Sequence, residues 1–369
     1  MINPGVMAEI TVLGAGMMGS ALCIPLADAG HAVRLVGTHL DEDIVQSLKH
    51  ASHHPKLDLP LPSSIRAYSL GELSDAMQNA KLIVLGVSSA GVRWAARQIA
   101  PFVRADVPIL MVSKGLEWNG ESFRTLPDVL CDELPSSVRS QAFPVAIAGP
   151  CIAGELARRV ETCVVFTGRN PALTALCASF FAVPYYHIWS SEDVVGVEAS
   201  AALKNAYAMG IAFALGLHEK RKGGPIADSA PAPGSIALHN YEAAVFAQAV
   251  YEMQRIVSLA GGNAASAAGL AGVGDLDVTC SGGRTGRFGR WLGLGLGVSE
   301  AVRRMHGATL ECLDILRVVR SALADLQARA ALGASELPLL RHMAAVALDD
   351  APVDMPFSEF FGGRRERQA

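Results

Sequence analysis

The sequence lacks an excess of basic residues, and its charged fraction is small. Only 18% of the 369 residues are charged, with 35 acidic against 31 basic side chains, so the formal net charge is −4. Nucleic acids and anionic membranes bind concentrated basic faces, so neither is an expected partner. Apolar residues make up 51% of the chain, which is enough for a large core and excludes disorder as its main state.

Long hydrophobic runs are also missing. The most apolar stretch, Ala208–Leu217, is about half of the roughly 20 residues that a transmembrane helix requires. The first residues carry neither the basic stretch nor the long apolar stretch of a signal peptide. We therefore expect neither membrane insertion nor a secretory leader.

The seven cysteines include no C-x-x-C pair and lie far apart. Their odd number and wide spacing argue against both a disulfide framework and a zinc site. The sequence therefore predicts no metal site and a cytoplasmic protein, whose thiols stay reduced.

The first half of the chain contains short apolar, β-rich runs separated by segments long enough for one helix each. The runs are Ile10–Leu13, Ala32–Val36, Leu82–Val87, Ile109–Val112, Val145–Ala148 and Cys163–Phe166. This alternation is typical of βαβ crossovers and a largely parallel sheet. It predicts an α/β domain over residues 1–190.

The β signal stops after about Ser190. Four later segments carry alanine, leucine and methionine at helical spacing: Asp193–Leu217, Asn240–Ala260, Glu311–Leu332 and Glu336–Leu348. They predict an all-α C-terminal domain over residues 191–361. Because no proline- or serine-rich linker separates the halves, we expect two closely packed domains with a cleft between them.

Two segments interrupt this pattern. His218–Leu238 is rich in proline, glycine and polar residues and predicts a long irregular loop, of the kind that is often functional. Residues 362–369 predict a flexible tail.

The strongest local signal is a G-x-G-x-x-G motif at Gly14, Gly16 and Gly19, between an apolar strand and a helix that begins at Met17 and Met18. The first glycine permits a tight turn, the second lets the backbone approach a pyrophosphate, and the third lets helix pack on strand. The free N–H groups and dipole of the helix N-terminus then favour phosphate. The motif predicts a Rossmann-type dinucleotide site.

The choice of cofactor stays open between NAD and NADP. An acid that binds the ribose 2′-hydroxyl is expected at the end of the second strand, but that strand is followed by Thr38 and His39. Asp41 comes slightly later and could equally cap the next helix. A polar end without an acid would not repel a 2′-phosphate, which favours NADP slightly.

Lys204 lies among alanines, methionines and a phenylalanine on a helix that should be heavily buried. A buried ammonium is costly unless it is paired or used. A lysine acting as a base near neutral pH must lose roughly three pKa units, which burial and a nearby cation such as Lys114 could supply. The structural alternatives are a snorkelling lysine or an ion pair with Asp275, and the pair is compatible with catalysis.

From Ile10 to about Phe361 the chain resembles the NAD(P)-dependent glycerol-3-phosphate dehydrogenase family. The matching motifs are G-A-G-x-x-G, S-K-G-L at Ser113–Leu116, G-P-x-x-A-x-E at Gly149–Glu155, G-V-E with K-N at Gly196–Asn205, and G-L-A-G-x-G-D-L-x-x-T-C at Gly269–Cys280. The resemblance implies a Rossmann-type domain followed by a helical domain. By analogy it also implies a homodimer.

The reaction that the resemblance implies is reversible hydride transfer between nicotinamide and C2 of glycerol 3-phosphate or dihydroxyacetone phosphate. Lys204 would be the general acid/base, Lys114 would stabilise the developing charge, and Asp275 would orient Lys204 or bind substrate hydroxyls. The implied substrate-binding residues are Lys114, Gly149, Cys151, Lys204, Asn205, Asp275, Thr279, Gly283, Arg284 and Thr285. The implied cofactor-binding residues are Gly14, Gly16, Met17, Met18, Gly19, Thr38, Ser88, Lys114, Ala153, Arg284 and Glu311.

The chain departs from the family pattern mainly where substrate is expected to bind. Thr285 replaces an asparagine, Cys151 a serine or threonine, and Gln248 an arginine, while Gly86–Ser89 lacks the usual proline. The His218–Leu238 segment is also longer than its usual counterpart. These differences leave open a dehydrogenase of another polyol phosphate or hydroxy compound.

A second alternative is a non-catalytic nucleotide-binding sensor or scaffold. Such a protein needs only the glycine turn. The chain keeps Lys114, Lys204, Asp275 and Arg284 together, which favours the enzyme.

Overall fold

The structure is a computed structural model that describes residues 7–140, 142–224, 238–281, 283–355 and 357–361. The chain divides into two compact units. The first consists of Met1–Gly115 and Arg124–Ala201, and the second of Leu116–Phe123 and Ala202–Ala369.

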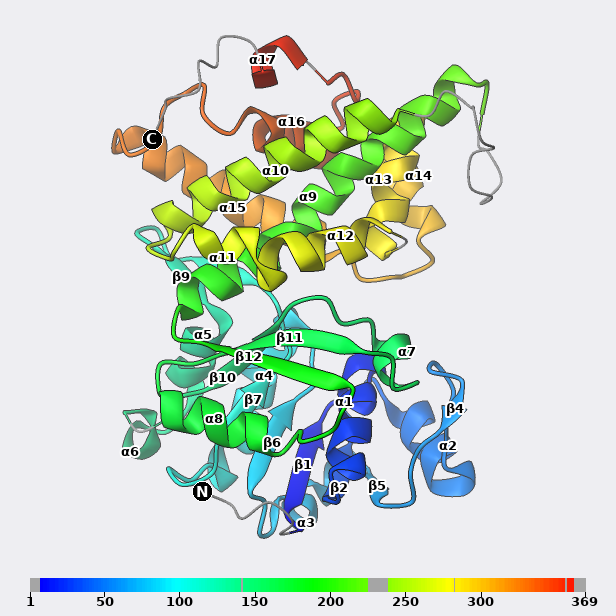
Figure 1. The fold of residues 1–369 in the computed structure, drawn as a ribbon, viewed down its shortest axis with the longest axis vertical. Coiled ribbons are helices and arrows are strands. Elements are labelled where there is room, and N and C mark those ends of the chain that lie inside the picture. The colour runs from blue at the N-terminus through cyan, green and yellow to red at the C-terminus, as the bar shows by residue number, and fades with distance from the viewer. Residues whose placement is uncertain (1–6, 141, 225–237, 282, 356, 362–369) are drawn as a thin grey trace. The chain divides into compact units, whose positions relative to one another are not determined.

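The first unit is built on an eight-stranded sheet in the order β12-β11-β10-β7-β6-β1-β2-β5 (Figure 1). The strands are β1 (Glu9–Leu13), β2 (Ala32–Val36), β5 (Ile65–Tyr68), β6 (Leu82–Leu85), β7 (Ile109–Met111), β10 (Val145–Ala148), β11 (Thr162–Thr167) and β12 (Tyr186–Ser191). Neighbours pair in parallel except β10 and β11, which are antiparallel. The expected largely parallel sheet and all six predicted strands are confirmed, whereas β5 and β12 were not predicted.

Helices cover both faces of this sheet. One core contains residues of α1 (Met17–Asp28), α2 (Glu42–Ala51), α7 (Ala153–Leu156) and α8 (Pro171–Ser179), and the other contains residues of α3 (Leu73–Met77), α4 (Val92–Ile99) and α5 (Leu126–Glu133). Successive residues of a strand point to opposite faces. In β6, Leu82 and Val84 therefore join the first core, and Ile83 and Leu85 join the second.

Smaller elements complete the first unit. The short strands β3 (His53–His54) and β4 (Leu59–Pro60) pair antiparallel after α2, and α6 (Ser136–Arg139) follows α5.

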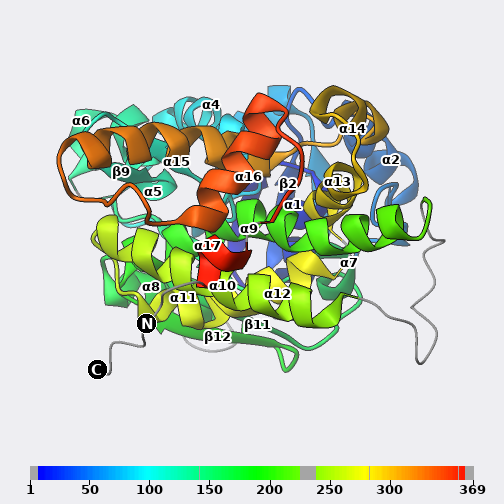
Figure 2. The ribbon, with the colours of Figure 1, turned by 90° about the horizontal axis from the view of Figure 1, so that it is seen from above.

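The second unit is helical, as predicted, apart from the strand β8 (Leu116–Trp118), which pairs with β9 (Phe123–Thr125). Its helices are α9 (Val194–Arg221, whose first residues belong to the first unit), α10 (His239–Leu259), α11 (Ala265–Ala268), α12 (Asp275–Cys280), α13 (Arg284–Leu294), α14 (Val298–Arg304), α15 (Glu311–Ala328), α16 (Pro338–Asp349) and α17 (Phe357–Phe361). Figures 1 and 2 show α10 running beside α9, and the Tyr207 hydroxyl donates to Glu252 across them at 3.1 Å. The predicted boundary at residue 190 placed β8 in the first domain, but β8 belongs to the second unit. There Trp118 Nε1 donates to Asp325 at 2.6 Å.

Helices α9 and α13 pack backbone against backbone through glycine. A Cβ added to Gly289 would lie 2.2 Å from the Met209 carbonyl oxygen, and one added to Gly216 would lie 2.1 Å from the Arg290 carbonyl oxygen. Since real Cβ atoms do not approach so closely, these glycines permit the helices to touch.

The expectation of a loop beginning at His218 was wrong for its first residues. His218–Arg221 forms the last turn of α9, with His218 and Glu219 buried. Arg290 Nε donates to Glu219 at 2.9 Å, and this ion pair lets a polar segment enter the core. Residues 225–237 of the predicted loop, and the predicted tail 362–369, lie outside the described residues.

Within the described residues, no helix combines the length and apolarity needed to cross a membrane.

Candidate active site

The first and third motif glycines are required by close backbone contacts. Gly14 has φ +115°, and a Cβ there would lie 2.6 Å from the Gly86 carbonyl oxygen. A Cβ on Gly19 would lie 2.1 Å from the Gly14 carbonyl oxygen. These contacts pack the start of α1 onto the ends of β1 and β6.

Gly16 serves a different purpose. It is the N-cap of α1 and has no side-chain cap, and no atom lies within 4 Å of the position that its Cβ would take. The first N–H groups of α1 have no acceptor within the helix, so an open space borders a set of donors. A pyrophosphate fits this cradle. Met17 is 43% exposed there, whereas the Met18 side chain packs against the core.

At the end of β2, Asp41 points away from the helix that it precedes. It occupies the N-cap position of α2 but makes no capping bond. Its Oδ2 accepts from Thr38 N at 2.9 Å, Thr38 Oγ1 at 2.7 Å and Ala15 N at 3.2 Å. The alternative that Asp41 caps α2 through its side chain is therefore wrong.

The remaining predicted residues of the first unit follow strand ends. Ser88 is exposed after β6, and Lys114 Nζ donates to the Gly149 carbonyl oxygen at 3.5 Å. Gly149 has φ +113°, Cys151 is half-buried, and Ala153 is buried at the start of α7. Because these positions follow β6, β7 and β10, they lie at the carboxyl edge of the sheet, where open α/β folds bind ligands.

Sequence reasoning did not single out Glu198 as a site residue. It lies in the first turns of α9, is fully buried, and neither carboxyl oxygen has a hydrogen-bond partner among the described residues. Burial raises the pKa of Glu198 to about 8; the charge of Lys114 lowers it, and that of Asp128 raises it. The signal was an acid within an otherwise apolar helical segment, the same signal that drew attention to Lys204.

Lys204 lies at the centre of a polar cluster in the second unit. Its side chain is 10% exposed, and Nζ donates to Asp275 Oδ1 at 2.7 Å and to Thr279 Oγ1 at 2.7 Å. The Thr279 hydroxyl in turn donates to the Asp275 carbonyl oxygen at 2.6 Å. The structure thus brings together three predicted site residues from α9 and α12.

The next residue of α9, Asn205, belongs to a second polar cluster. Asn205 Nδ2 donates to Glu311 Oε2 at 3.4 Å, and the half-exposed Arg284 guanidinium lies 3.8 Å from Glu311 Oε1. Arg284 is the first residue of α13, whose N-cap is Gly283. A guanidinium beside the N–H groups of a helix N-terminus suits a phosphate.

Thr285 does not join this group. It is buried and hydrogen-bonds the Cys312 thiol instead. A further departure from the family pattern, Gln248, also has a structural partner, since its Nε2 donates to buried Glu252 at 2.6 Å. The Glu252 carboxylate also accepts from the backbone of Leu339 and Leu340 at the start of α16.

The described residues contain no group of three or more His, Cys, Asp or Glu arranged to hold a metal ion. All seven cysteines are free. Burial raises the pKa of Cys280 and Cys312 to about 12, so neither thiol ionises readily.

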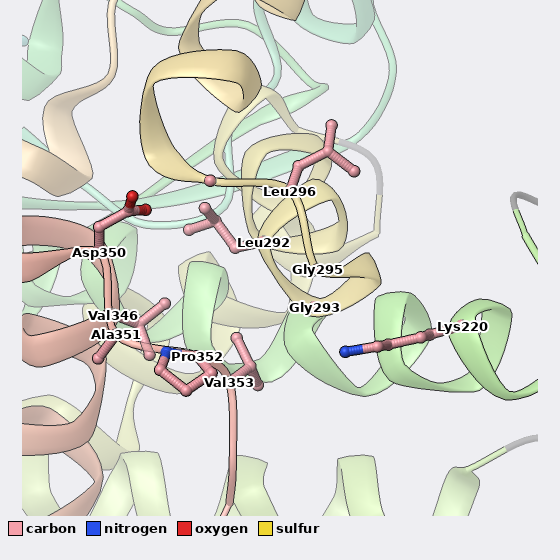
Figure 3. A pocket seen from close by; sticks show the side chains of 11 residues that line it. Lys220, Leu292, Gly293, Gly295, Leu296, Val346, Asp350, Ala351, Pro352 and Val353 are labelled. Carbon is pink, nitrogen blue, oxygen red and sulfur yellow. The ribbon is translucent and has the colours of Figure 1, made fainter.

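A cavity of about 220 Å³ in the second unit is separate from these clusters (Figure 3). Lys220 of α9 borders it, as do Leu292 of α13 and Asp350 after α16. The Asp350 carboxylate accepts from Val298 N at 2.7 Å. No predicted site residue lines this cavity.

Two family models match the chain. Residues 9–174 match the NAD-dependent glycerol-3-phosphate dehydrogenase N-terminus, and residues 193–357 match the C-terminus of the same family. The NADP(+)-dependent glycerol-3-phosphate dehydrogenase of Archaeoglobus fulgidus is 34% identical over 297 residues, which cover 80% of this chain and 83% of the relative. A glycerol-3-phosphate dehydrogenase [NAD(P)+] of Shouchella clausii is 30% identical over 303 residues, 81% of this chain and 82% of the relative.

Solved structures agree with this assignment. The glycerol-3-phosphate dehydrogenase of Coxiella burnetii matches with a TM-score of 0.76 and 26% identity, over 96% of this chain and 98% of that one. The Plasmodium falciparum glycerol-3-phosphate dehydrogenase shares the fold, with a TM-score of 0.78 and 17% identity over 98% and 97% of the two chains. With its glycine turn, its Lys204–Asp275–Thr279 cluster and both family models matched in order, the chain belongs to the NAD-dependent glycerol-3-phosphate dehydrogenase family.

Proposed function

We propose that the protein catalyses reversible hydride transfer between a nicotinamide cofactor and C2 of glycerol 3-phosphate or dihydroxyacetone phosphate. The observation that carries this proposal is the buried Lys204 ammonium held between Asp275 and Thr279. Family membership and the names of the relatives at 30–34% identity supply the substrate.

Lys204 acts as the general acid/base. During reduction its ammonium donates a proton to the C2 oxygen, and during oxidation the neutral amine takes that proton back. Asp275 and Thr279 fix the position of Nζ, and the Asp275 carboxylate stabilises the ammonium form. The nicotinamide, when bound, supplies or accepts the hydride.

Two further cations assist. Lys114 stabilises negative charge that develops on the C2 oxygen. Arg284 binds the substrate phosphate together with the first N–H groups of α13, and Glu311 and Asn205 orient its guanidinium. Gly149, Cys151 and Gly283 complete the substrate contacts.

The cofactor is NAD or NADP, held through the pyrophosphate at Gly14–Gly19 and the first turn of α1. Thr38 and Ser88, at the ends of their strands, and Ala153 contribute the remaining contacts of the first unit. The exposed space beside Gly16 supports this assignment.

The test is an assay of purified protein with dihydroxyacetone phosphate, in which loss of reduced-nicotinamide absorbance is followed separately with NADH and NADPH. Turnover with kcat/KM of roughly 10⁴ M⁻¹s⁻¹ or more is expected. Dihydroxyacetone, which lacks the phosphate, is the control substrate and should react far more slowly. Cofactor binding without turnover of either compound would refute the proposed substrate.

We also propose that the protein is a cytoplasmic homodimer. The cysteines are free, three of them buried and four half-buried, which suits a reducing compartment. Leu215 of α9 is 46% exposed on the helical unit, and a second copy would cover it. Sedimentation analysis should give twice the monomer mass, and a monomer at micromolar concentration would contradict the dimer.

A further inference from the structure

The glycine turn is held by two buried side chains that lie outside the G-x-G-x-x-G motif. Asp41 and His54 both bond the backbone of Ala15, the residue between the first two motif glycines. Asp41 Oδ2 accepts from Ala15 N at 3.2 Å, and His54 Nε2 lies 3.1 Å from the Ala15 carbonyl oxygen. Both side chains are buried, with 8% and 0% of the residue exposed.

The hydrogen bonds of His54 define its protonation. Leu57 N donates to His54 Nδ1 at 3.0 Å, so Nδ1 is the acceptor and Nε2 carries the proton that reaches the Ala15 carbonyl oxygen. Burial lowers the pKa of His54, which keeps this neutral form. The Ser20 hydroxyl donates to the same carbonyl oxygen at 3.1 Å.

The hydrogen-bonding capacity of the Ala15 backbone is thus used within the protein. Its N–H is directed to Asp41 and its carbonyl to His54 and Ser20. Gly14 N also donates to the Val36 carbonyl oxygen at 2.8 Å. The turn is consequently fixed before any ligand arrives, with the donors of the first turn of α1 left facing outward.

Asp41 holds the turn through a single carboxylate oxygen. All three of its donors, Ala15 N, Thr38 N and Thr38 Oγ1, converge on one oxygen, Oδ2. These bonds tie the orientation of the Asp41 carboxylate to the backbone of Ala15 and Thr38. From Gly37 to Leu40 the chain carries no other acid.

We propose that Asp41 and His54 are positioning residues that preorganise the pyrophosphate-binding turn. This inference rests on the proposed function, because it presumes that the turn binds a nicotinamide dinucleotide. A preorganised turn improves affinity because less ordering is left for the ligand to impose.

The convergence on one oxygen makes a sharp test possible. An amide oxygen can occupy the place of Oδ2 and accept from the same donors, so Asp41→Asn should keep the turn, whereas Asp41→Ala removes the acceptor. We would measure Kd for NADH and for NADPH by nicotinamide fluorescence, together with Tm without cofactor. Asp43→Asn, an exposed acid on the same helix, is the matched control.

For Asp41→Ala we expect both Kd values to rise by the same factor, roughly tenfold or more. Asp41→Asn and Asp43→Asn should stay close to the unaltered protein. His54→Gln, whose amide can donate to the Ala15 carbonyl, should bind both cofactors better than His54→Ala, and His50→Gln is its exposed control.

Loss of NADH binding alone, or a gain for NADPH, in Asp41→Ala would overturn the proposal, because Asp41 would then be a ribose ligand. Unchanged Kd values in Asp41→Ala and His54→Ala would overturn it as well. A fall in Tm alike in the Ala and Asn variants, with Kd following it, would show a merely structural role. If the unaltered protein bound neither cofactor, the proposed function itself would fail.

Discussion

Lys204 Nζ and Asp275 Oδ1 lie 2.7 Å apart although 71 positions separate the residues in the chain. The pair joins α9 to α12 inside the second unit. The carboxylate stabilises the buried ammonium, and its bonds to the carboxylate and to the Thr279 hydroxyl fix the position of Nζ.

Replacement of Lys204 by alanine should abolish most of the turnover. We expect kcat to fall by about 10²- to 10⁴-fold, the usual contribution of general acid–base catalysis. Cofactor Kd should change little, because Lys204 is not among the proposed cofactor contacts. Steady-state kinetics and a fluorescence titration would check both points. Lys220→Ala, on the same helix, is the control, and a near-normal kcat in Lys204→Ala would remove Lys204 as the acid/base.

Arg284→Ala should act mainly on the affinity for a phosphorylated substrate. Loss of a charge-assisted contact is worth about 10- to 100-fold in KM. KM for dihydroxyacetone phosphate, and inhibition by inorganic phosphate, would be measured beside Arg287→Ala, an exposed arginine of the same helix. An unchanged KM would refute the assignment of Arg284 to the phosphate.

Two glycines of one motif should give opposite results. Gly19→Ala places a Cβ 2.1 Å from a carbonyl oxygen and should destabilise the protein by about 1–3 kcal/mol. Gly16→Ala meets no atom within 4 Å, so its Tm should be that of the unaltered protein while its cofactor Kd rises. Thermal melting and cofactor titration of both variants provide the comparison. Equal effects on Tm would contradict the distinction.

The buried Glu198 should make stability depend on pH. Its pKa rises from the usual 4.5 to about 8, so between these values the folded protein binds a proton that the unfolded chain does not. Stability should therefore be greatest below about pH 4.5 as far as this group is concerned, and fall as pH rises toward 8, with a slope of up to about 1.4 kcal/mol per pH unit.

Glu198→Gln removes the titrating group and should flatten this slope. Urea unfolding at several pH values between 5 and 8 (about one unit apart) would measure it. Glu192→Gln, an exposed acid just before the same helix, should leave the slope in place. Identical slopes in the unaltered protein and Glu198→Gln would show that Glu198 is ionised throughout.

The sequence predicted the parts of the fold that depend on local pattern. The strands of the sheet centre are continuous apolar runs, and the glycine turn has a local requirement at each position. The edge strand β5, Ile65–Tyr68, has no apolar run that would predict it, because Arg66 is exposed and its neighbours are only partly buried. Such a strand is defined by the neighbour with which it pairs rather than by its own pattern.

Side-chain direction at the site depended on tertiary contacts. Asp41 has a local partner in Thr38, but its contact with Ala15 lies 26 positions away, and the sequence offered helix capping as an equal alternative. Thr285 is buried and hydrogen-bonds the Cys312 thiol, a contact that its motif does not reveal. Roles for these residues could be carried over from a motif, but not the orientation of each side chain.

The glycine contacts between α9 and α13 have a consequence for substrate choice. Lys204 lies on α9 and Arg284 on α13. The backbones of these two helices are in contact, which restricts their movement relative to each other. The backbone positions of the proposed acid/base and of the proposed phosphate ligand are thus fixed relative to each other. A fixed backbone spacing favours substrates in which the phosphate and the reacting hydroxyl are a set number of bonds apart, as they are in glycerol 3-phosphate.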